Sequence, residues 1–288
     1  MIASGLAKKT DKIAVWLERV ININMSKIKN DKYYTPPDLA EYMVNKTKEI
    51  IGEQNITEYI EPSAGAGVFL DYLDKPYIAY DIDPEDDRII KQDWLTVDLQ
   101  YKNGRCIIGN PPYGDRNTLL VQFYKKSIML SDYISFIMPI SQFNNNQQMY
   151  EFNLIYSEDL GKKIYSDREI HCCINIYKKP LNELNKKPNY KLQDVLITEY
   201  RRNGTYKKPN IYDFGMCSWG ASLGKEVEYV GQYAQENYIY VINKKYKNKI
   251  IKLCKDTDWK NLYPYTSSPK IQTWKIYKYI KEQIPEIQ

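Results

Sequence analysis

The sequence predicts an α/β fold in which a mostly parallel sheet is closed by an antiparallel strand pair, with a small C-terminal α+β domain after it. Short apolar segments with strand character alternate with segments of helical spacing between residues 58 and 139, which is typical of a parallel sheet. A glycine turn, Gly65–Gly67, separates the first strand from the first helical segment. The composition changes near residue 180, where polar and proline-marked sequence begins, so a second domain is expected from there.

Five segments are expected to form the main strands, and two helical segments are expected between them. Each strand candidate is short, rich in apolar or β-branched residues and bounded by turn residues. Arg105–Gly109 is almost entirely apolar, as expected of a strand buried on both faces. The strands are predicted at Glu58–Glu61, Tyr77–Tyr80, Ile89–Trp94, Arg105–Gly109 and Tyr133–Pro139, and the helices at Val68–Leu73 and Leu119–Leu130.

Two further segments, Lys163–Tyr165 and Cys172–Tyr177, are expected to close the sheet as an antiparallel pair. Polar, proline-marked stretches at 178–180 and 185–189 then place a domain boundary near residue 180. Beyond it, strands are expected at 195–197 and 238–242 and a terminal helix at 273–284. The expected division is a leader or short helix over 1–29, a sheet domain over 30–180 and a smaller domain over 181–288.

Composition and length exclude several classes of protein. The chain of 288 residues has no apolar run near the roughly 20 residues that span a bilayer, so no membrane contact is expected, and residues 1–24 lack the apolar core of a signal peptide. The five cysteines are odd in number and lack metal-ligand spacing, which favours a reducing, cytoplasmic compartment. With a single histidine, His171, neither a zinc site nor a Ser-His-Asp triad is expected, and no metal is predicted.

Charge is distributed unevenly along the chain. Residues 181–288 contain 19 lysines and arginines against 11 aspartates and glutamates, whereas residues 1–180 contain 22 against 25. A basic back half joined to a neutral-to-acidic front half is typical of a protein that meets a polyanion. The alternative is compositional, because abundant lysine, asparagine, isoleucine and tyrosine are also expected of an AT-rich genome.

Three acidic residues stand at successive strand ends around the glycine turn. Glu61 directly precedes the turn, Asp81 ends the second strand and Asp93 ends the third. At such positions one carboxylate can accept both hydroxyls of a ribose, another the amino group of an adenine, and the third can meet an ammonium group. Each acid alone is more often a solvated turn residue, but three in this order indicate a nucleoside ligand.

The segment Asn110–Tyr113, Asn-Pro-Pro-Tyr, follows the most apolar strand. Two consecutive prolines cannot continue a central strand, and they restrict φ so that the Pro111 carbonyl is held in place. The Asn110 side-chain oxygen and that carbonyl can accept both N–H groups of a planar exocyclic amine, and Tyr113 offers a flat face to a base. The segment therefore predicts a site that positions such an amine; the alternative is a proline-rich turn.

With these motifs in order, residues 30–180 resemble the adenine-N6-specific DNA methyltransferases of the gamma motif order, within the wider group of N-P-P-Y amino-methyltransferases. In that family a T-P-P element precedes the glycine motif of the cofactor site, and N-P-P-Y follows it. N-P-P-Y alone is shared with methyltransferases of RNA and of protein glutamine, and the T-P-P element favours DNA adenine. The matching segments are Tyr34–Pro37, Glu61–Gly67, Tyr80–Pro84, Asp93–Trp94 and Asn110–Tyr113.

The resemblance implies a Rossmann-like class I methyltransferase sheet and S-adenosyl-L-methionine as the cofactor. The family often packs an aromatic residue on the second face of the target base, a place for which His171 and Tyr165 are both open. The resemblance puts Thr35 and Pro36 at the methionine end of the cofactor. The implied catalytic residues are Asn110, Pro111, Pro112 and Tyr113, and the cofactor-binding residues are Tyr34, Thr35, Pro36, Glu61, Ala64, Gly65, Gly67, Asp81, Ile82, Asp93 and Trp94.

The resemblance further implies methyl transfer to N6 of a flipped adenine in duplex DNA, with 30–180 as the catalytic domain and 181–288 as the target-recognition or nucleic-acid-contacting domain. The basic and aromatic runs Arg201–Arg202, Tyr206–Lys208 and Lys244–Lys247 suit phosphate contact and base stacking. The resemblance is compatible with a restriction-enzyme or specificity partner and with a bacterial, phage or viral source. The alternatives are the same chemistry on RNA adenine or a protein glutamine amide, and a non-catalytic nucleic-acid-binding subunit.

Overall fold

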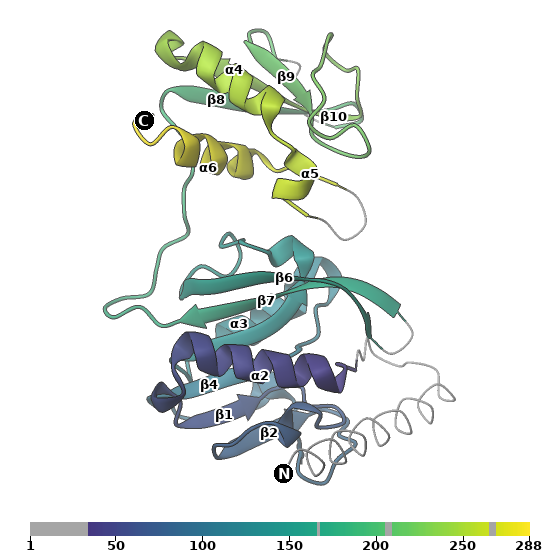
Figure 1. Ribbon diagram of the computed structural model, residues 1–288, viewed down its shortest axis with the longest axis vertical. Helices are drawn as coiled ribbons and strands as arrows, with labels where there is room; N and C mark the ends of the chain where they lie inside the picture. Colours follow the sequence, from purple (N-terminus) through teal and green to yellow (C-terminus); the bar gives the residue numbers. More distant parts are fainter. Residues whose placement is uncertain (1–33, 166–167, 205–208, 265–268) are drawn as a thin grey trace, which may run out of the picture. The chain divides into compact units, whose positions relative to one another are not determined.

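The computed structural model describes residues 34–165, 168–204, 209–264 and 269–288. The chain forms two compact units, which divide between Lys187 and Pro188 (Figure 1). The division falls inside the second of the two polar, proline-marked stretches, whereas the composition predicts it near residue 180. The segment 1–29, expected to be a leader or short helix, lies outside the described residues.

The first unit is built on one seven-stranded sheet with the order β3-β2-β1-β4-β5-β7-β6. Every adjacent pair from β3 to β5 is parallel, and β7 is antiparallel to both β5 and β6. This confirms the predicted Rossmann-like sheet with its antiparallel closing pair. Its strands are β1 (Glu58–Glu61), β2 (Tyr77–Asp81), β3 (Ile90–Lys91), β4 (Arg105–Gly109), β5 (Tyr133–Pro139), β6 (Asn153–Tyr165) and β7 (Arg168–Lys178).

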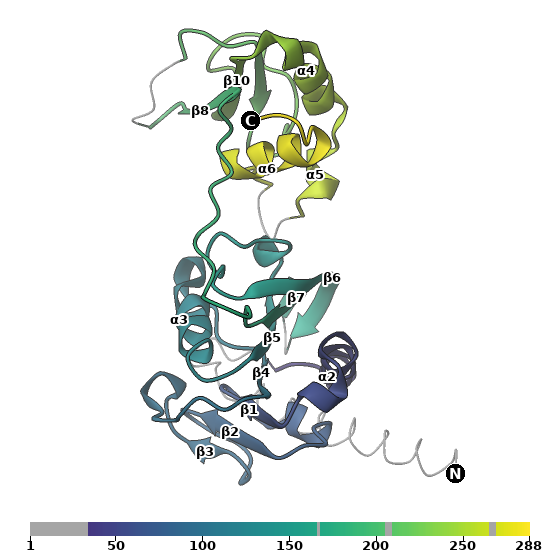
Figure 2. The ribbon, with the colours of Figure 1, turned by 90° about the vertical axis from the view of Figure 1, so that its left-hand side faces the viewer.

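Alternate side chains of the central strands enter two separate cores, as the two-residue period of a strand requires. In β4, Ile107 packs with residues of α3, while Cys106 and Ile108 pack with residues of α2. Figure 2 shows α2 (Pro37–Ile51) and α3 (Thr118–Ser127) on opposite faces of the sheet. Both faces of β4 and β5 are therefore buried, which explains their nearly continuous apolar sequence.

Helix α2 is not among the predicted elements, although its sequence carries a start and a stop signal. Pro36 is the N-cap and Pro37 lies in the first turn, where a missing N–H costs no hydrogen bond. Leu39 and Met43, one turn apart, are both buried, and Gly52 follows the helix with a φ of 83°. The T-P-P element is thus also the start of a helix.

Three segments of the first unit differ from the expectations. Residues 68–73 form only the 3₁₀ helix η2 (Phe69–Asp71), because β2 begins at Tyr77 and leaves no room for a longer helix. The third strand is limited to two residues, and Trp94 begins the 3₁₀ helix η3 (Trp94–Thr96) instead. The closing strands β6 and β7 extend well beyond the predicted segments. Further 3₁₀ helices are η1 (Glu53–Asn55), η4 (Asp115–Asn117) and η5 (Ile140–Gln142) in the first unit, and η6 (Lys244–Tyr246) in the second.

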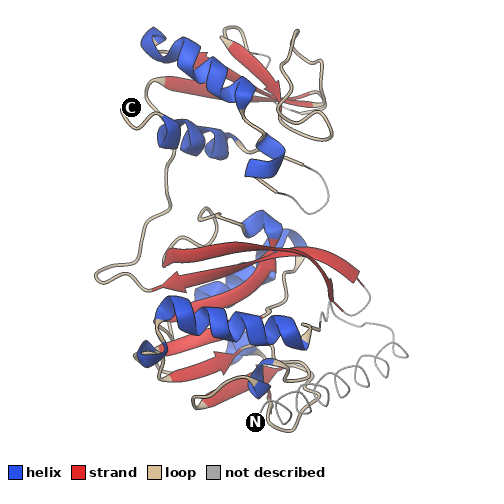
Figure 3. Ribbon diagram, viewed as in Figure 1, coloured by secondary structure: helices blue, strands red, loops and turns tan. Residues whose placement is uncertain are grey.

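The second unit is a three-stranded antiparallel sheet, in the order β8-β10-β9, with helices packed on one of its faces (Figure 3). Ile197, Met216 and Ile239 from the three strands share a core with Ile250 of α4 and Ile280 of α6, which confirms the predicted small α+β domain. In both units, none of the described helices is long and apolar enough to cross a membrane. The elements are β8 (Val195–Arg201), β9 (Phe214–Cys217), β10 (Gln235–Val241), α4 (Lys247–Asp256), α5 (Trp259–Leu262) and α6 (Thr273–Gln283).

The buried centre of the large sheet leads to a stability prediction. Ile107 is fully buried in β4, so Ile107→Ala is expected to lower the free energy of unfolding of the first unit by about 2–5 kcal/mol. Urea denaturation followed by circular dichroism measures this loss. Ile155→Ala is the control, because that side chain lies on β6 with 39% of its surface exposed, and a loss under about 1 kcal/mol is expected. Equal losses would contradict the core position of Ile107.

A candidate ligand pocket and active site

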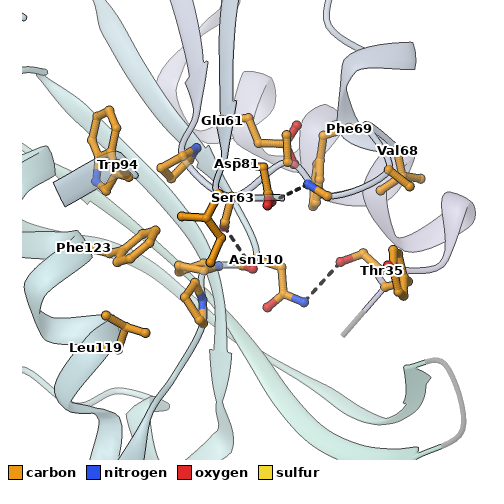
Figure 4. A pocket seen from close by; sticks show the side chains of 18 of the residues that line it. Thr35, Glu61, Ser63, Val68, Phe69, Asp81, Trp94, Asn110, Leu119 and Phe123 are labelled. Carbon is orange, nitrogen blue, oxygen red and sulfur yellow. Dashed lines mark hydrogen bonds between the residues drawn. The ribbon is translucent and has the colours of Figure 1, made fainter. Parts of the chain in front are cut away.

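A cavity of about 320 Å³ lies at the carboxyl ends of β1, β2 and β4. These strands are parallel neighbours, so the residues that follow them meet at one edge of the sheet. The volume is in the range typical of small-ligand sites. Figure 4 shows Asp81 and Asn110 in the middle, between a wall that includes Trp94 and Phe123 and a wall that includes Thr35.

Most of the residues singled out in the sequence line this one cavity. Pro36, Gly67 and Tyr113 do not line it: Pro36 caps α2, Gly67 shapes the glycine turn, and Tyr113 lies beside Asn110. The residues brought together come from the T-P-P element, the glycine turn and the ends of β1, β2, β3 and β4. They are Tyr34, Thr35, Glu61, Ala64, Gly65, Asp81, Ile82, Asp93, Trp94, Asn110, Pro111 and Pro112.

The rest of the cavity wall is mostly apolar, and its residues are not among the site residues that the sequence predicts. Leu119 and Phe123 lie one turn apart on α3, so both side chains leave the same face of the helix. That spacing is visible in the sequence, but it is equally typical of a core-facing helix. The additional lining residues are Pro62, Ser63, Ala66, Val68, Phe69, Leu95, Leu119 and Phe123.

The glycine turn brings a backbone amide to Asp81. Gly65 and Gly67 have φ values of 51° and 74°, a region that residues with side chains rarely adopt. The Gly65 N–H donates to Asp81 Oδ2 at 2.8 Å, and the Asp83 N–H donates to Asp81 Oδ1 at 2.8 Å. Each carboxylate oxygen keeps a further acceptor position. Asp81 therefore fixes the turn and can still accept hydrogen bonds from a ligand.

Glu61 ends β1 and is a buried carboxyl group, with 1% of its surface exposed. Its Oε2 accepts no hydrogen bond from any described residue. Burial, and after it the charge of Asp81, raise the pKa of Glu61 well above its ordinary value, and the charge of Arg88 opposes them. Such a buried acceptor is costly unless a donor or a cation meets it. Glu61 therefore marks the part of the cavity suited to a positively charged group.

Asp93 and Trp94 contribute differently to the cavity. Asp93 is exposed, and its Oδ1 accepts from the Leu95 N–H at 2.9 Å, so it caps η3. Trp94 is almost fully buried, and its ring lies 6.0 Å from that of Tyr80. The Asp93 carboxylate keeps acceptor capacity for a ligand, whereas most of the Trp94 indole belongs to the core.

Asn110 is held by three contacts from different parts of the chain. Its Nδ2 donates to Thr35 Oγ1 at 3.2 Å, and its Oδ1 accepts from Tyr113 Oη at 3.1 Å. Its backbone carbonyl accepts from Ser63 Oγ at 3.4 Å. Because the amide nitrogen is turned to Thr35 (Figure 4), the amide oxygen is the side-chain atom that can accept from an amine.

Tyr113 is tied to its surroundings through its hydroxyl. The residue is partly exposed, but Oη lies 3.1 Å from Asn110 Oδ1 and 3.6 Å from Cys172 Sγ. Burial raises the pKa of this hydroxyl well above its ordinary value. Tyr113 therefore keeps its proton at neutral pH and can act as a hydrogen-bond donor as well as an aromatic surface.

The two aromatic side chains considered for the second face of a base do not line the cavity. Tyr165 ends β6 and is 1% exposed. His171 Nε2 lies 2.6 Å from Asp159 Oδ1, across the β6–β7 pair. The Tyr165 side chain is thus part of the hydrophobic core, and that of His171 is held by Asp159.

Three solved structures illustrate the similarity of the fold. A candidate RNA methyltransferase from Pyrococcus horikoshii is 18% identical, with 55% of this chain and 96% of that chain covered and a TM-score of 0.44. A candidate class I S-adenosylmethionine-dependent methyltransferase from Listeria monocytogenes is 14% identical, with 62% and 71% covered and a TM-score of 0.45. A type I restriction-modification methyltransferase subunit from Streptococcus thermophilus is 15% identical, with 54% and 46% covered and a TM-score of 0.38.

No protein-family model matches the chain, and no curated protein sequence matches it. At identities of 14%, 15% and 18%, the likeness to solved structures concerns the fold alone.

Proposed function

We propose that this chain transfers a methyl group from S-adenosyl-L-methionine to the exocyclic N6 amine of a flipped adenine in duplex DNA. The position of Asn110 carries the proposal: its amide group, fixed through Thr35, stands in the same cavity as Glu61 and Asp81. A nucleoside ligand and a planar amine would therefore meet in one place. The order of the motifs along the chain and the class I sheet support the same activity.

The cavity fits S-adenosyl-L-methionine in charge and in acceptor positions. Glu61 Oε2 is a buried acceptor for the positively charged amino end, and Asp81 keeps acceptor positions for two ribose hydroxyls. When bound, this cofactor supplies an electrophilic methyl group. The other residues proposed to hold it are Tyr34, Thr35 and Pro36 at the methionine end, Ala64, Gly65 and Gly67 at the turn, and Ile82, Asp93 and Trp94 at the adenine.

The residues of the chain are proposed to position the amine rather than to act as a strong base. The lone pair of an exocyclic adenine amine is delocalised into the ring, so the amine is a weak nucleophile. Asn110 Oδ1 and the Pro111 carbonyl would accept its two N–H bonds and favour a more tetrahedral nitrogen. Pro112 restricts the backbone, and the Tyr113 ring offers a stacking face. Fixed acceptors at the place where positive charge develops stabilise the transition state.

DNA is the proposed substrate because of the T-P-P element and the basic second unit. We assign residues 30–180 to catalysis and 181–288 to contact with duplex DNA, in a protein that works in the cytoplasm. A restriction-enzyme or specificity subunit is compatible with this assignment. The rival substrates are RNA adenine and a protein glutamine amide, and the rival role is that of a non-catalytic nucleic-acid-binding subunit.

Identification of the methylated product tests the proposal. The full chain is incubated with S-adenosyl-L-methionine that carries a labelled methyl group and, separately, with unmethylated genomic DNA, with ribosomal and transfer RNA, or with cell protein. Labelled N6-methyladenine from the DNA digest is the expected product. Label found only in RNA or only in protein would show that this molecule, and not DNA, is the substrate. Cofactor binding without any labelled product would favour the non-catalytic role.

The burial of Glu61 predicts that the cofactor binds with a pH-dependent affinity. Because its pKa is raised, this carboxyl group is protonated in the free protein at acidic pH and must ionise to meet an ammonium group. The affinity is therefore expected to increase as the pH rises through the raised pKa, with release of a proton on binding. Calorimetric titration in buffers of different ionisation enthalpy measures that proton.

The matched variant is Glu61→Gln, which keeps the shape of the side chain and cannot ionise. It is expected to weaken cofactor binding by about 10- to 100-fold and to abolish the proton release. If the wild type bound the cofactor at acidic pH without releasing a proton, Glu61 would not contact the positively charged amino end of the cofactor.

The excess of basic residues in the second unit predicts that DNA affinity falls steeply with salt. Lys245 is exposed in the middle of η6, and Lys245→Gln is expected to reduce the slope of log affinity against log salt by about 1. Lys91 is also exposed, on β3 of the first unit, and Lys91→Gln is expected to leave the slope unchanged. Fluorescence anisotropy at several salt concentrations provides the slopes. A salt-independent affinity would rule out residues 181–288 as the phosphate-contacting surface.

A further inference from the structure

The hydroxyl of Tyr113 lies between Asn110 Oδ1, which accepts its hydrogen, and the Cys172 thiol, whose sulfur can accept or donate a hydrogen bond. Tyr113 Oη is 3.1 Å from Asn110 Oδ1 and 3.6 Å from Cys172 Sγ. Cys172 belongs to β7, which is separated from β4 by β5 in the sheet, so only the folded chain brings the three groups together. A hydroxyl carries one hydrogen and can donate to one acceptor at a time.

The contact with Asn110 occupies the oxygen that the proposed reaction needs. A phenol hydrogen on Asn110 Oδ1 takes one of its lone pairs and lowers its strength as an acceptor. It also places a partial positive charge near the amine, where positive charge develops during methylation. A hydrogen directed to Cys172 Sγ removes both effects. Rotation about the bond between the ring and Oη is sufficient, because both acceptors are already within reach of the same oxygen.

Both partners of this rotation stay neutral. Burial raises the pKa of the Tyr113 hydroxyl and of the Cys172 thiol, so the hydrogen remains on Oη and changes only its direction. Cys172 is 0% exposed, and water therefore does not compete for its sulfur; its other polar neighbour is the hydroxyl of Tyr165. The neighbouring Cys173 is equally buried, but its Sγ lies 3.5 Å from the Pro139 carbonyl, which it donates to.

We propose that Cys172 is a positioning residue. When the target amine donates its hydrogen bond to Asn110 Oδ1, the Tyr113 hydroxyl turns away from that oxygen and donates to Cys172 Sγ instead. The inference rests on the proposed function, since it requires an amine substrate at Asn110. It gives the Tyr113 hydroxyl a role separate from that of the ring. It also assigns Cys172 to the rate of methyl transfer and not to cofactor binding.

Single-turnover methyl transfer to unmethylated genomic DNA tests the kinetic consequence. In Cys172→Ala the hydroxyl has lost its second acceptor and stays on Asn110, so the rate is expected to fall about tenfold with unchanged cofactor affinity. In the Cys172→Ala, Tyr113→Phe double variant no hydroxyl is left to place. Its rate is therefore expected to return to that of Tyr113→Phe alone. Cys173→Ala is the control and is expected to keep the wild-type rate.

The infrared S–H stretching band of Cys172, assigned by comparison with Cys172→Ser, provides a readout that does not depend on turnover. The band is expected to shift in Tyr113→Phe, because the thiol loses one of its two hydroxyl neighbours and keeps that of Tyr165, and to stay in place in Cys173→Ala. The inference would be overturned by an S–H band that does not shift in Tyr113→Phe. With an active wild type, it would also be overturned by a double variant that is slower than Tyr113→Phe. Either result would leave the proposed function intact. A wild type that methylates neither DNA, RNA nor protein refutes the proposed function and the inference with it.

Discussion

Asn110→Ala is expected to lower the rate of methyl transfer by about 10²- to 10³-fold at saturating S-adenosyl-L-methionine. The substitution removes the amide oxygen that is proposed to accept an N–H of the target amine, while Glu61 and Asp81 stay in place. The amide of Asn110 contacts Thr35 and Tyr113, neither of which holds the glycine turn. The cofactor is therefore expected to bind almost as tightly as in the wild type, so that turnover is lost and binding is kept.

Single-turnover kinetics and calorimetric titration of the cofactor measure the two quantities separately. Thr35→Val serves as a graded comparison, because it keeps the shape of the side chain and removes the Oγ1 partner of Asn110 Nδ2. The freed amide can turn, and a loss of about tenfold in rate is expected. If Asn110→Ala lost cofactor affinity and kept its turnover, Asn110 would belong to the cofactor site and not to the amine site.

The strands that carry the site are the part of the fold that the sequence predicts best. The predicted segments Arg105–Gly109 and Tyr133–Pro139 have the bounds observed for β4 and β5. Both strands are covered by helices, so a nearly continuous apolar run results. The exception is Arg105, which is buried as the ion-pair partner of Glu58. The outer strands β3 and β6 lack that cover, and their bounds were predicted less well.

The helices depend more on the tertiary structure. Helical spacing at residues 68–73 suggests a helix, but the short path from the glycine turn to β2 permits only η2. Conversely, α2 forms where no helix is predicted, although Pro37 and Gly52 mark its ends. Its buried face is created by packing against β1 and β4, which supports the general view that packing stabilises helices more than local propensity does.

Within the candidate site, motifs give the identity of the polar groups but not the bonds between them. Thr35 and Asn110 belong to separate motifs, and their hydrogen bond depends on how α2 lies against the end of β4. The same holds for Tyr113 and Cys172, since nothing in the Asn-Pro-Pro-Tyr segment points to a thiol on β7. The helical spacing of Phe123 assigns it only to the core. In the structure this side chain also lines the cavity.

The largest loss of cofactor affinity is expected from Asp81→Asn, which turns one acceptor oxygen into a donor. The two oxygens of Asp81 accept N–H groups from Gly65 and Asp83, each at 2.8 Å. Whichever way the amide is turned, its NH₂ group faces one of these donors, so a hydrogen bond is replaced by a repulsive contact. The negative charge proposed to face the ribose hydroxyls is lost as well. Together these changes are expected to weaken cofactor binding by about 10²- to 10³-fold.

Asp93→Asn is the matched control for this prediction. Asp93 Oδ1 accepts from the Leu95 N–H at 2.9 Å, and an asparagine oxygen can keep that bond because asparagine is itself a good helix cap. A loss of affinity of about tenfold or less is therefore expected. Calorimetric titration compares the two variants, and both should turn over normally once saturated, since neither carboxylate contacts Asn110. Equal affinities would mean that Asp81 does not couple the glycine turn to the ligand, and the cofactor site would have to be placed elsewhere in the cavity.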